Sequence, residues 1–255
     1  MDKNSDTSWE TSSSWYDKIV GAKGHYYHQQ VIIPGILRLL EAEKTSQPHL
    51  LDLACGQGIL ARHLPKGMKY CGIDGSASLI ESAKRYGQKG THQFLVHDLM
   101  NAIDLPSKDF SHATCILAVQ NLAQPTALFS TASAYLRKNA PFIIVLNHPC
   151  FRIPRQSGWG VDEQKKLQYR RIERYMSSLK IPIQTQPSKQ TSSEQTWSFH
   201  NPLSYYTAQL KQAGFVLDQI EEWCSDKKSV GKTAAMENRS RQEFPLFMTL
   251  IARKA

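Results

Sequence analysis

The feature that most constrains this chain is an apolar run that leads into a glycine-rich turn, with the sequence LLDLACGQG over residues 50–58. An apolar run of this length suits a buried strand, and glycines let the backbone after it approach a ligand that side chains would keep away. Gly56, Gly58 and Ala61 also fit the dinucleotide-binding pattern G-x-G-x-x-G/A. The run therefore predicts a nucleoside-type ligand at the end of a buried strand, and the turn alone does not say which one.

From residue 50 onward, short apolar runs alternate with amphipathic runs, as in parallel strands joined by crossover helices. The expected strands are 50–53, 70–73, 94–96, 113–118 and 142–146, and the expected connecting helices are 59–64, 79–86 and 126–136. Two helices, 25–33 and 35–42, precede them; a helix at 203–213 and strands at 215–220 and 247–252 follow, with a loop over 231–243. The pattern predicts an α/β fold with a Rossmann-like, doubly wound sheet.

The domain organisation predicted from the sequence is simple. Residues 1–14 are polar and are expected to form a flexible tail, and residues 15–255 are expected to form a single domain. Residues 149–199 interrupt the sheet pattern and are predicted to be an inserted cap. Within this cap a helix with a basic outer face is expected to act as a lid, burying apolar side chains at helical spacing, namely Leu167, Ile172, Tyr175, Met176 and Leu179.

An acidic residue ends each of three successive predicted strands. A carboxylate at Asp52, beside the glycine-rich turn, would repel a pyrophosphate and attract a sulfonium or amino group. Asp74 lies where the hydroxyl groups of a ribose would bind, and Asp98 could accept a hydrogen bond from an adenine amino group. Asp52 therefore favours S-adenosylmethionine over a dinucleotide as the cofactor, while Asp74 would suit the ribose of either nucleoside.

Taken in order, these motifs resemble those of the class I S-adenosylmethionine-dependent methyltransferases, over about residues 45–147. The resemblance implies a seven-stranded, mostly parallel sheet in which the antiparallel last strand, 247–252, lies beside the fifth. It further implies that Asp52, Ala54 and the turn from Gly56 to Gly58 hold the methionine part of the cofactor. Ala54 stands where the family frequently has glycine. The remaining contacts implied are Asp74 with Gly75 at the ribose, and Asp98 with Leu99 at the adenine.

Two further segments bear on the acceptor of the methyl group. The run from Trp197 to Leu203, followed by Ala213-Gly214-Phe215, is similar to the small-molecule branch of that family, which includes quinone-type methyltransferases. In that branch N-terminal aromatic residues close over the cofactor, so Tyr26 is predicted to contact it, and Trp15, Tyr16 and Tyr27 are expected nearby. Packing between helices is the alternative role for these rings.

Two histidines are the candidate catalytic residues, because histidine can take a proton near neutral pH. His148 follows the fifth expected strand and His200 leads into the helix at 203–213, although either could equally be a hydrogen-bonded structural residue. Gln120 and Asn121, after the fourth strand, are candidate contacts for the acceptor. No cluster of residues has the spacing of a metal site, so no metal is expected.

The net charge of +9, most of which lies after residue 151, leaves an RNA acceptor open. The Asn/Asp-Pro-Pro-aromatic motif of amino-group nucleic-acid methyltransferases is absent after the fourth strand, where Gln120-Asn121-Leu122-Ala123 stands. A small-molecule acceptor is therefore the main prediction, with an RNA methyltransferase using the basic cap, or an inactive S-adenosylmethionine-binding module, as alternatives.

The expected location is the cytoplasm. No run approaches the roughly 20 apolar residues needed to span a membrane, and the first 14 residues are polar, unlike a signal peptide. The five cysteines form no C-x-x-C pair, and their odd number does not suggest a disulfide framework.

Overall fold

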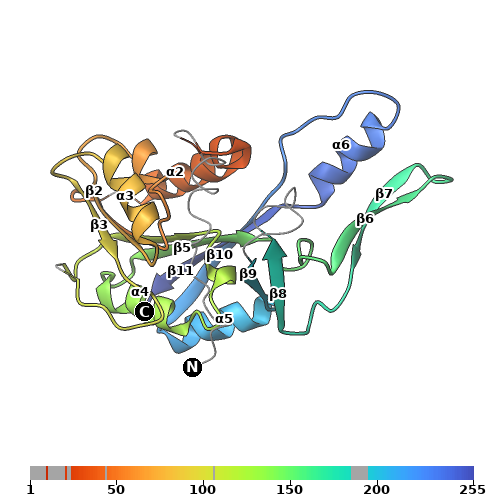
Figure 1. The fold of residues 1–255 in the computed structure, drawn as a ribbon. Coiled ribbons are helices and arrows are strands. Elements are labelled where there is room, and N and C mark those ends of the chain that lie inside the picture. The colour runs from red at the N-terminus through yellow and green to blue at the C-terminus, as the bar shows by residue number, and fades with distance from the viewer. Residues whose placement is uncertain (1–9, 11–20, 22–23, 44, 106, 185–194) are drawn as a thin grey trace.

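The computed structural model describes residues 10, 21, 24–43, 45–105, 107–184 and 195–255. Its centre is a seven-stranded sheet in the order β10-β11-β5-β4-β1-β2-β3 (Figure 1). The strands of this sheet are β1 (His49–Leu53), β2 (Lys69–Asp74), β3 (His92–Val96), β4 (His112–Ile116), β5 (Pro141–Asn147), β10 (Phe215–Trp223) and β11 (Phe247–Lys254). The expected tail, residues 1–14, lies outside the described residues apart from Glu10.

Five neighbouring strands, β5, β4, β1, β2 and β3, run parallel, and β11 pairs antiparallel with both β5 and β10. The direction of winding reverses between β1 and β4. In such sheets ligands bind outside the carboxyl ends of the strands at this reversal. The predicted Rossmann-like sheet with an antiparallel last strand is confirmed.

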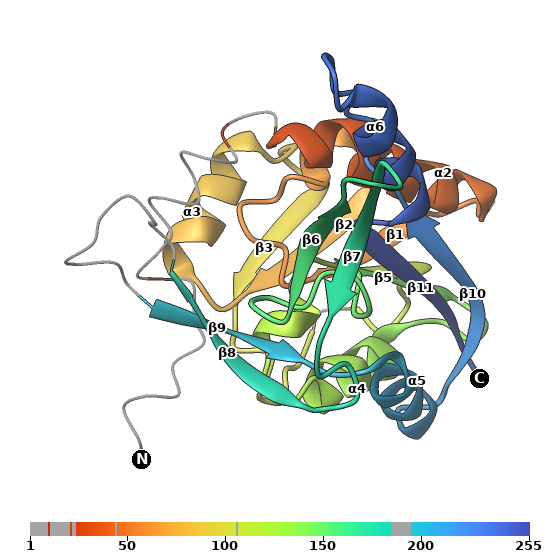
Figure 2. The ribbon, with the colours of Figure 1, turned by 90° about the vertical axis from the view of Figure 1, so that its right-hand side faces the viewer.

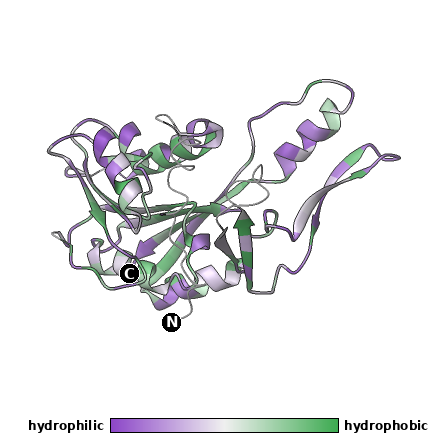
Figure 3. Cartoon of the chain, viewed as in Figure 1, coloured by the Kyte–Doolittle hydropathy of each residue, from purple (hydrophilic) through white to green (hydrophobic). Residues whose placement is uncertain are grey.

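Helices cover both faces of the sheet (Figure 1). On one face α2 (Ile33–Ala42) and α3 (Ala77–Tyr86) pack against Leu50, Tyr70 and Ile143. On the other, α4 (Thr126–Tyr135) and α5 (Leu203–Gln212) pack against Leu51, Ile73 and Phe142. Figure 3 shows the central strands as the most continuously hydrophobic part of the chain. Alternate residues of a strand point to opposite faces, so a sheet buried on both sides needs these unbroken apolar runs.

The two helices expected before β1 form one continuous helical segment over residues 26–42. Near its start is a π-helical turn, η1 (His28–Ile32), in which the N–H of Ile33 donates to the carbonyl of His28. Pro34, two residues after this turn, has no N–H for an α-helical bond, so the wider turn forms where the ladder is interrupted.

The predicted helix in residues 149–199 is wrong. The segment forms two antiparallel hairpins, β6 (Ser157–Asp162) with β7 (Leu167–Ile172), and β8 (Leu179–Gln184) with β9 (Gln195–His200). Exposed and half-buried residues alternate along β7, which is the period of a strand. Met176, expected to face inward, is 71% exposed. Both hairpins lie in front of the carboxyl ends of the sheet in Figure 2.

Other boundaries also differ from those expected. The predicted loop at 231–243 contains α6 (Ala234–Glu243), and the helix expected at 59–64 is the single 3-10 turn η2 (Ala61–His63). The strand expected at 113–118 ends at Ile116, because Leu117 takes a left-handed conformation with φ 53°. Within the described ranges, no helix is both long and apolar enough to cross a membrane.

Candidate functional site

The glycine-rich turn leaves β1 through three residues in the left-handed region: Ala54 (φ 59°), Gly56 (φ 55°) and Gly58 (φ 70°). This conformation explains why glycine suits position 54, where the alanine carries a strain of roughly 1 kcal/mol. A β-carbon on Gly58 would lie 3.0 Å from the ring of Phe94 and 3.1 Å from the methyl group of Ala83. Because Gly58 has no side chain, the turn can pack closely against α3 and β3.

Asp52 lies directly before this turn and is only 2% exposed. The hydroxyl of Tyr70 donates to one carboxylate oxygen at 2.7 Å, and that of Thr114 donates to the other at 2.8 Å. Burial raises the pKa of Asp52 to about 6, although both hydrogen bonds favour the charged form. The chain thus holds a carboxylate away from water directly beneath the turn.

Asp74 ends β2 and ties the turn to the next helix. One of its oxygens accepts the N–H of Gly56 at 2.8 Å, and the other accepts the N–H of Ser76 at 2.9 Å. Burial raises the pKa of Asp74, and the nearby carboxylate of Glu10 raises it further. A carboxylate has about four acceptor positions, so after these two bonds Asp74 can still accept hydrogen bonds from ligand hydroxyls.

Asp98 follows β3 in an exposed turn. Its carboxylate accepts the N–H of Met100 at 2.9 Å and the side-chain amide of Asn101 at 3.0 Å, while Leu99 beside it is buried. The N–H of His97 donates to the carbonyl of Asp74 at 2.9 Å, so the ends of β2 and β3 are joined. Gly75 lies in open space, since a β-carbon there would meet only the carbonyl of His97, at 3.9 Å.

The acids at this edge repel one another. Asp74 raises the pKa of Asp52, and neither carboxylate forms an ion pair with a basic side chain among the described residues. Two desolvated carboxylates without a cation leave a strongly negative site at the carboxyl ends of β1 and β2.

His148, which follows β5, is buried, and both of its ring nitrogens are bonded. Nε2 lies 2.7 Å from the carboxylate of Glu222, and Nδ1 accepts the N–H groups of Cys150 at 3.2 Å and Phe151 at 3.3 Å. A carboxylate can only accept, so Nε2 carries the proton of the neutral ring. Burial lowers the pKa of His148 despite the opposing effect of Glu222. In this arrangement the ring orients the turn after β5.

His200, at the end of β9, is also buried. Its Nε2 lies 2.8 Å from the carbonyl of Tyr175, and burial lowers its pKa. Gln120, in the short turn η3 (Val119–Asn121) after β4, bonds the backbone of Asn147 through both amide atoms, at 2.9 and 3.1 Å. The predicted acceptor contact is therefore engaged in joining the ends of β4 and β5.

Tyr26 is 41% exposed, and it contacts its neighbour Tyr27 and the segment after β10. Its hydroxyl donates to Asp226 at 2.8 Å, and the ammonium of Lys227 lies 4.5 Å from its ring centroid. Tyr27 packs edge-on against Phe247 at the start of β11. These rings lie at the β11 side of the sheet; Trp15 and Tyr16 lie outside the described residues.

Sequence reasoning missed three residues that complete the site. Tyr70 and Thr114 hold the two oxygens of Asp52, and Glu222 orients His148. A threonine inside the apolar strand β4 was a usable signal, because a buried hydroxyl needs a partner. Glu222 lay beyond the predicted end of its strand and could not have been assigned.

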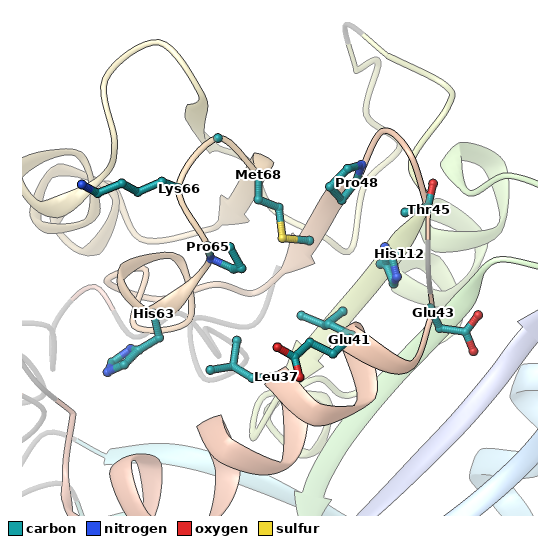
Figure 4. Close-up of a pocket in the computed structure, with 12 residues that line it drawn as sticks. Leu37, Glu41, Glu43, Thr45, Pro48, His63, Pro65, Lys66, Met68 and His112 are labelled. Carbon is teal, nitrogen blue, oxygen red and sulfur yellow. The ribbon is translucent and has the colours of Figure 1, made fainter.

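A cavity of about 570 Å³ lies at the opposite edge of the sheet, among residues that precede β1, β2 and β4 (Figure 4). Figure 4 shows Leu37 and Glu41 of α2 on one side of it and Pro65 and Met68 on the other. Because ligands of doubly wound sheets bind at the carboxyl ends, this cavity is not the site built by the three acids. In the part of the chain that the structure describes, no three His, Cys, Asp or Glu side chains cluster as metal ligands.

Comparison with known proteins agrees with this geometry. A protein family described as "Methyltransferase domain" matches residues 24–220. The ubiquinone biosynthesis O-methyltransferases of Coxiella burnetii strains are 29% identical to the chain over 112 residues, which is 42% of this chain and 47% of theirs. The chain thus matches about half the length of these curated relatives.

Solved structures share the fold. An S-adenosylmethionine-dependent methyltransferase from Mesorhizobium loti matches with a TM-score of 0.65 and 22% identity, over 85% of this chain and 96% of that one. A putative S-adenosylmethionine-dependent methyltransferase from Listeria monocytogenes matches with a TM-score of 0.62 and 21% identity, over 87% and 99%.

Proposed function

Because this chain belongs to the methyltransferase-domain family, we propose that it is an enzyme that transfers the methyl group of S-adenosylmethionine to a small-molecule acceptor. The curated relatives are named for O-methylation in ubiquinone biosynthesis, which supports a small acceptor. The missing nucleic-acid motif after β4 supports the same choice over RNA.

The observation that carries the proposal is the pair of buried carboxylates at the carboxyl ends of β1 and β2. Asp52 and Asp74 make the local potential more negative, and their hydrogen-bond partners among the described residues, two hydroxyls and two backbone N–H groups, are neutral. A ligand with a sulfonium and an ammonium group would balance these charges, whereas a pyrophosphate would be repelled. The residues therefore fit S-adenosylmethionine better than a dinucleotide.

Each residue would have a distinct part in holding the cofactor. Ala54, Gly56 and Gly58 give the methionine part close access to the backbone, and Asp52 attracts its positive charge from below. Asp74, with Gly75, would hold the ribose, and Asp98 with Leu99 the adenine. S-adenosylmethionine supplies an electrophilic methyl group, and alignment of the acceptor with it supplies much of the acceleration, on the order of 7 to 11 kcal/mol in intramolecular analogues.

For the acceptor side, His148 and His200 remain the predicted residues, and their contacts favour positioning of the loops around the acceptor. Tyr26 remains a predicted contact of the bound cofactor. We also propose that the protein acts in the cytoplasm, where its five free cysteines would stay reduced.

Calorimetry tests the cofactor. We expect S-adenosylmethionine to bind and a nicotinamide dinucleotide not to bind. Asp74→Ala should weaken binding by about 1 to 3 kcal/mol, because a charged hydrogen-bonding partner is lost. Asp104→Ala, which removes an exposed carboxylate from the connection between β3 and β4, is the matched control and should leave the affinity unchanged. Binding of the dinucleotide and none of S-adenosylmethionine would overturn the proposal.

A further inference from the structure

Two arginines, Arg152 and Arg170, lie near the carboxyl end of β5 and have no carboxylate partner among the described residues. Arg152 belongs to the turn after β5, where its N–H donates to the carbonyl of His148 at 2.8 Å. Arg170 is on β7, and its guanidinium donates to the carbonyl of Phe151 at 2.6 Å and to the hydroxyl of Ser157 at 2.7 Å. Both partners of Arg170 are neutral.

Both guanidinium groups lie over the same aromatic ring, that of Trp159. Their central carbons lie 5.6 Å (Arg152) and 4.9 Å (Arg170) from the ring centroid of Trp159. Trp159 packs edge-on against Phe244, which in turn packs against Phe151, so an aromatic wall runs from the hairpin back to the sheet edge. The pair is therefore part of a built surface, joined to the end of β5 by the turn that His148 orients.

Arg152 is the under-bonded member of the pair. Its Nε is buried and has no hydrogen-bond acceptor among the described residues. Burial and the positive charge of Arg170 lower the pKa of Arg152 to about 10. A buried cation beside a second cation is costly unless an anion compensates it. Glu222, which lies on the same edge, is bonded to His148.

The position of the pair assigns it to the acceptor. The three acids of the cofactor site end β1, β2 and β3, whereas Arg152 follows β5 on the far side of the reversal between β1 and β4. A molecule lying beside the cofactor at this edge would reach Arg152. A guanidinium binds carboxylates and phosphates through paired, parallel hydrogen bonds.

We propose that the acceptor carries an oxyanion, a carboxylate or a phosphate ester, which Arg152 binds and the neighbouring positive charge of Arg170 reinforces. This inference rests on the proposed function, and it narrows the acceptor from any small molecule to an acidic one. The charges of the protein would thus be divided along the edge, with negative carboxylates beneath the cofactor and positive guanidinium groups beside the acceptor.

The test measures cofactor binding and anion binding in separate titrations, so that each proposal can fail without the other. Binding of S-adenosylhomocysteine is measured first by calorimetry, and it tests the cofactor site alone. The protein, with or without that ligand, is then titrated with benzoate, phenyl phosphate and the neutral benzamide. We expect at least one of the two anions to bind and benzamide not to bind; comparison of the two anions tells a carboxylate site from a phosphate site.

Variants identify the residue. Arg152→Gln should lower anion affinity about tenfold or more, and Arg152→Lys should restore it only in part, because lysine keeps the charge but not the paired geometry. Arg155→Gln, which removes an exposed arginine from the same loop, should stay within about twofold. The melting temperature of Arg152→Gln should equal or exceed that of the wild type, because the repulsion from Arg170 is removed.

Three results would overturn the inference: benzamide binding as well as the anions, no binding of either anion, or Arg152→Gln behaving like Arg155→Gln. A lower melting temperature with unchanged anion binding would likewise make Arg152 a structural residue. Failure of S-adenosylhomocysteine to bind would count against the cofactor proposal and would leave the anion titration interpretable.

Discussion

At Asp52 the stability of the folded protein conflicts with the charge that the cofactor site needs. Its carboxylate is buried beneath the glycine-rich turn, and its pKa is raised to about 6 from an ordinary value near 3.8. Since the folded state binds the proton more tightly than the unfolded state, Asp52 contributes most stability below about pH 4 and loses it as the pH rises through about 6. At neutral pH the protein carries a charge that its own fold disfavours.

Asp52→Asn should therefore stabilise the ligand-free protein at pH 7.5 and not at pH 4. The expected gain is on the order of 2 to 3 kcal/mol, the free energy that corresponds to the shift in pKa. Asparagine can keep both neighbours, because the hydroxyls of Tyr70 and Thr114 can rotate. Urea unfolding of both proteins at the two pH values measures the difference; a gain that is equal at both would show that Asp52 is not the titrating group.

At the scale of single residues, the sequence predicts the structure best where only one residue type fits a given backbone conformation. The end of β1 and the left-handed turn after it lie within the Asp52 to Gly58 run as expected, because glycine suits positive φ; the ligand of this run stays a prediction. The ring partners of His148 were not predictable, since Glu222 lies 74 residues away and meets it only through the sheet order β5-β11-β10. Contacts made by the pairing of distant strands leave no local signal.

At the scale of elements, the error in residues 149–199 has a physical cause. Apolar residues from Leu167 to Leu179 were interpreted at a helical spacing, but Leu167 at the start of β7 and Met176 in the turn between β7 and β8 are exposed. Along β7 the alternation is only between exposed and half-buried residues, so its strand period is weak in the sequence. The central strands lie between two helical layers, and their unbroken apolar runs were correctly located.

The hairpin β6-β7 should be dispensable for folding and for cofactor binding. The residues flanking it are already joined, because the N–H of Glu173 donates to the carbonyl of Gln156 at 2.8 Å. Replacing residues 157–172 by two glycines should keep the S-adenosylmethionine affinity within about threefold of the wild type, a change of roughly 0.7 kcal/mol.

The same variant should lose turnover of the acceptor, because Arg170 and Trp159 are removed. Calorimetry and a labelled-methyl assay give the two readouts. A shorter change, replacing only the exposed turn residues 163–166, is the control and should keep both activities. Loss of cofactor binding in the longer deletion would show that the hairpin supports the cofactor site directly.

At the scale of the whole molecule, the seven-stranded sheet depends on β11. It pairs with β5 on one side and with β10 on the other, and β10 has no other partner among the described strands. Removing residues 247–255 should therefore release β10 and expose the edge of β5, whose residues are almost all buried. An exposed apolar edge favours aggregation.

The truncated chain should aggregate on expression, while removal of Ala255 alone, as the control, should be tolerated. Light scattering and the yield after centrifugation measure the outcome. A monodisperse truncated protein with the circular dichroism of the wild type would contradict the role given to β11.

The same strand order matters while the protein is being made. The ribosome synthesises β5 about a hundred residues before β11, at roughly 5 to 20 residues per second. For several seconds the nascent chain therefore lacks the strand that lies between β5 and β10 in the folded sheet. During that interval β1 to β5 can pair, but β10 emerges with no neighbour to join. We therefore expect β11 to join the sheet late, by pairing with β5 and β10. The interval before it joins is when a chaperone would be most useful.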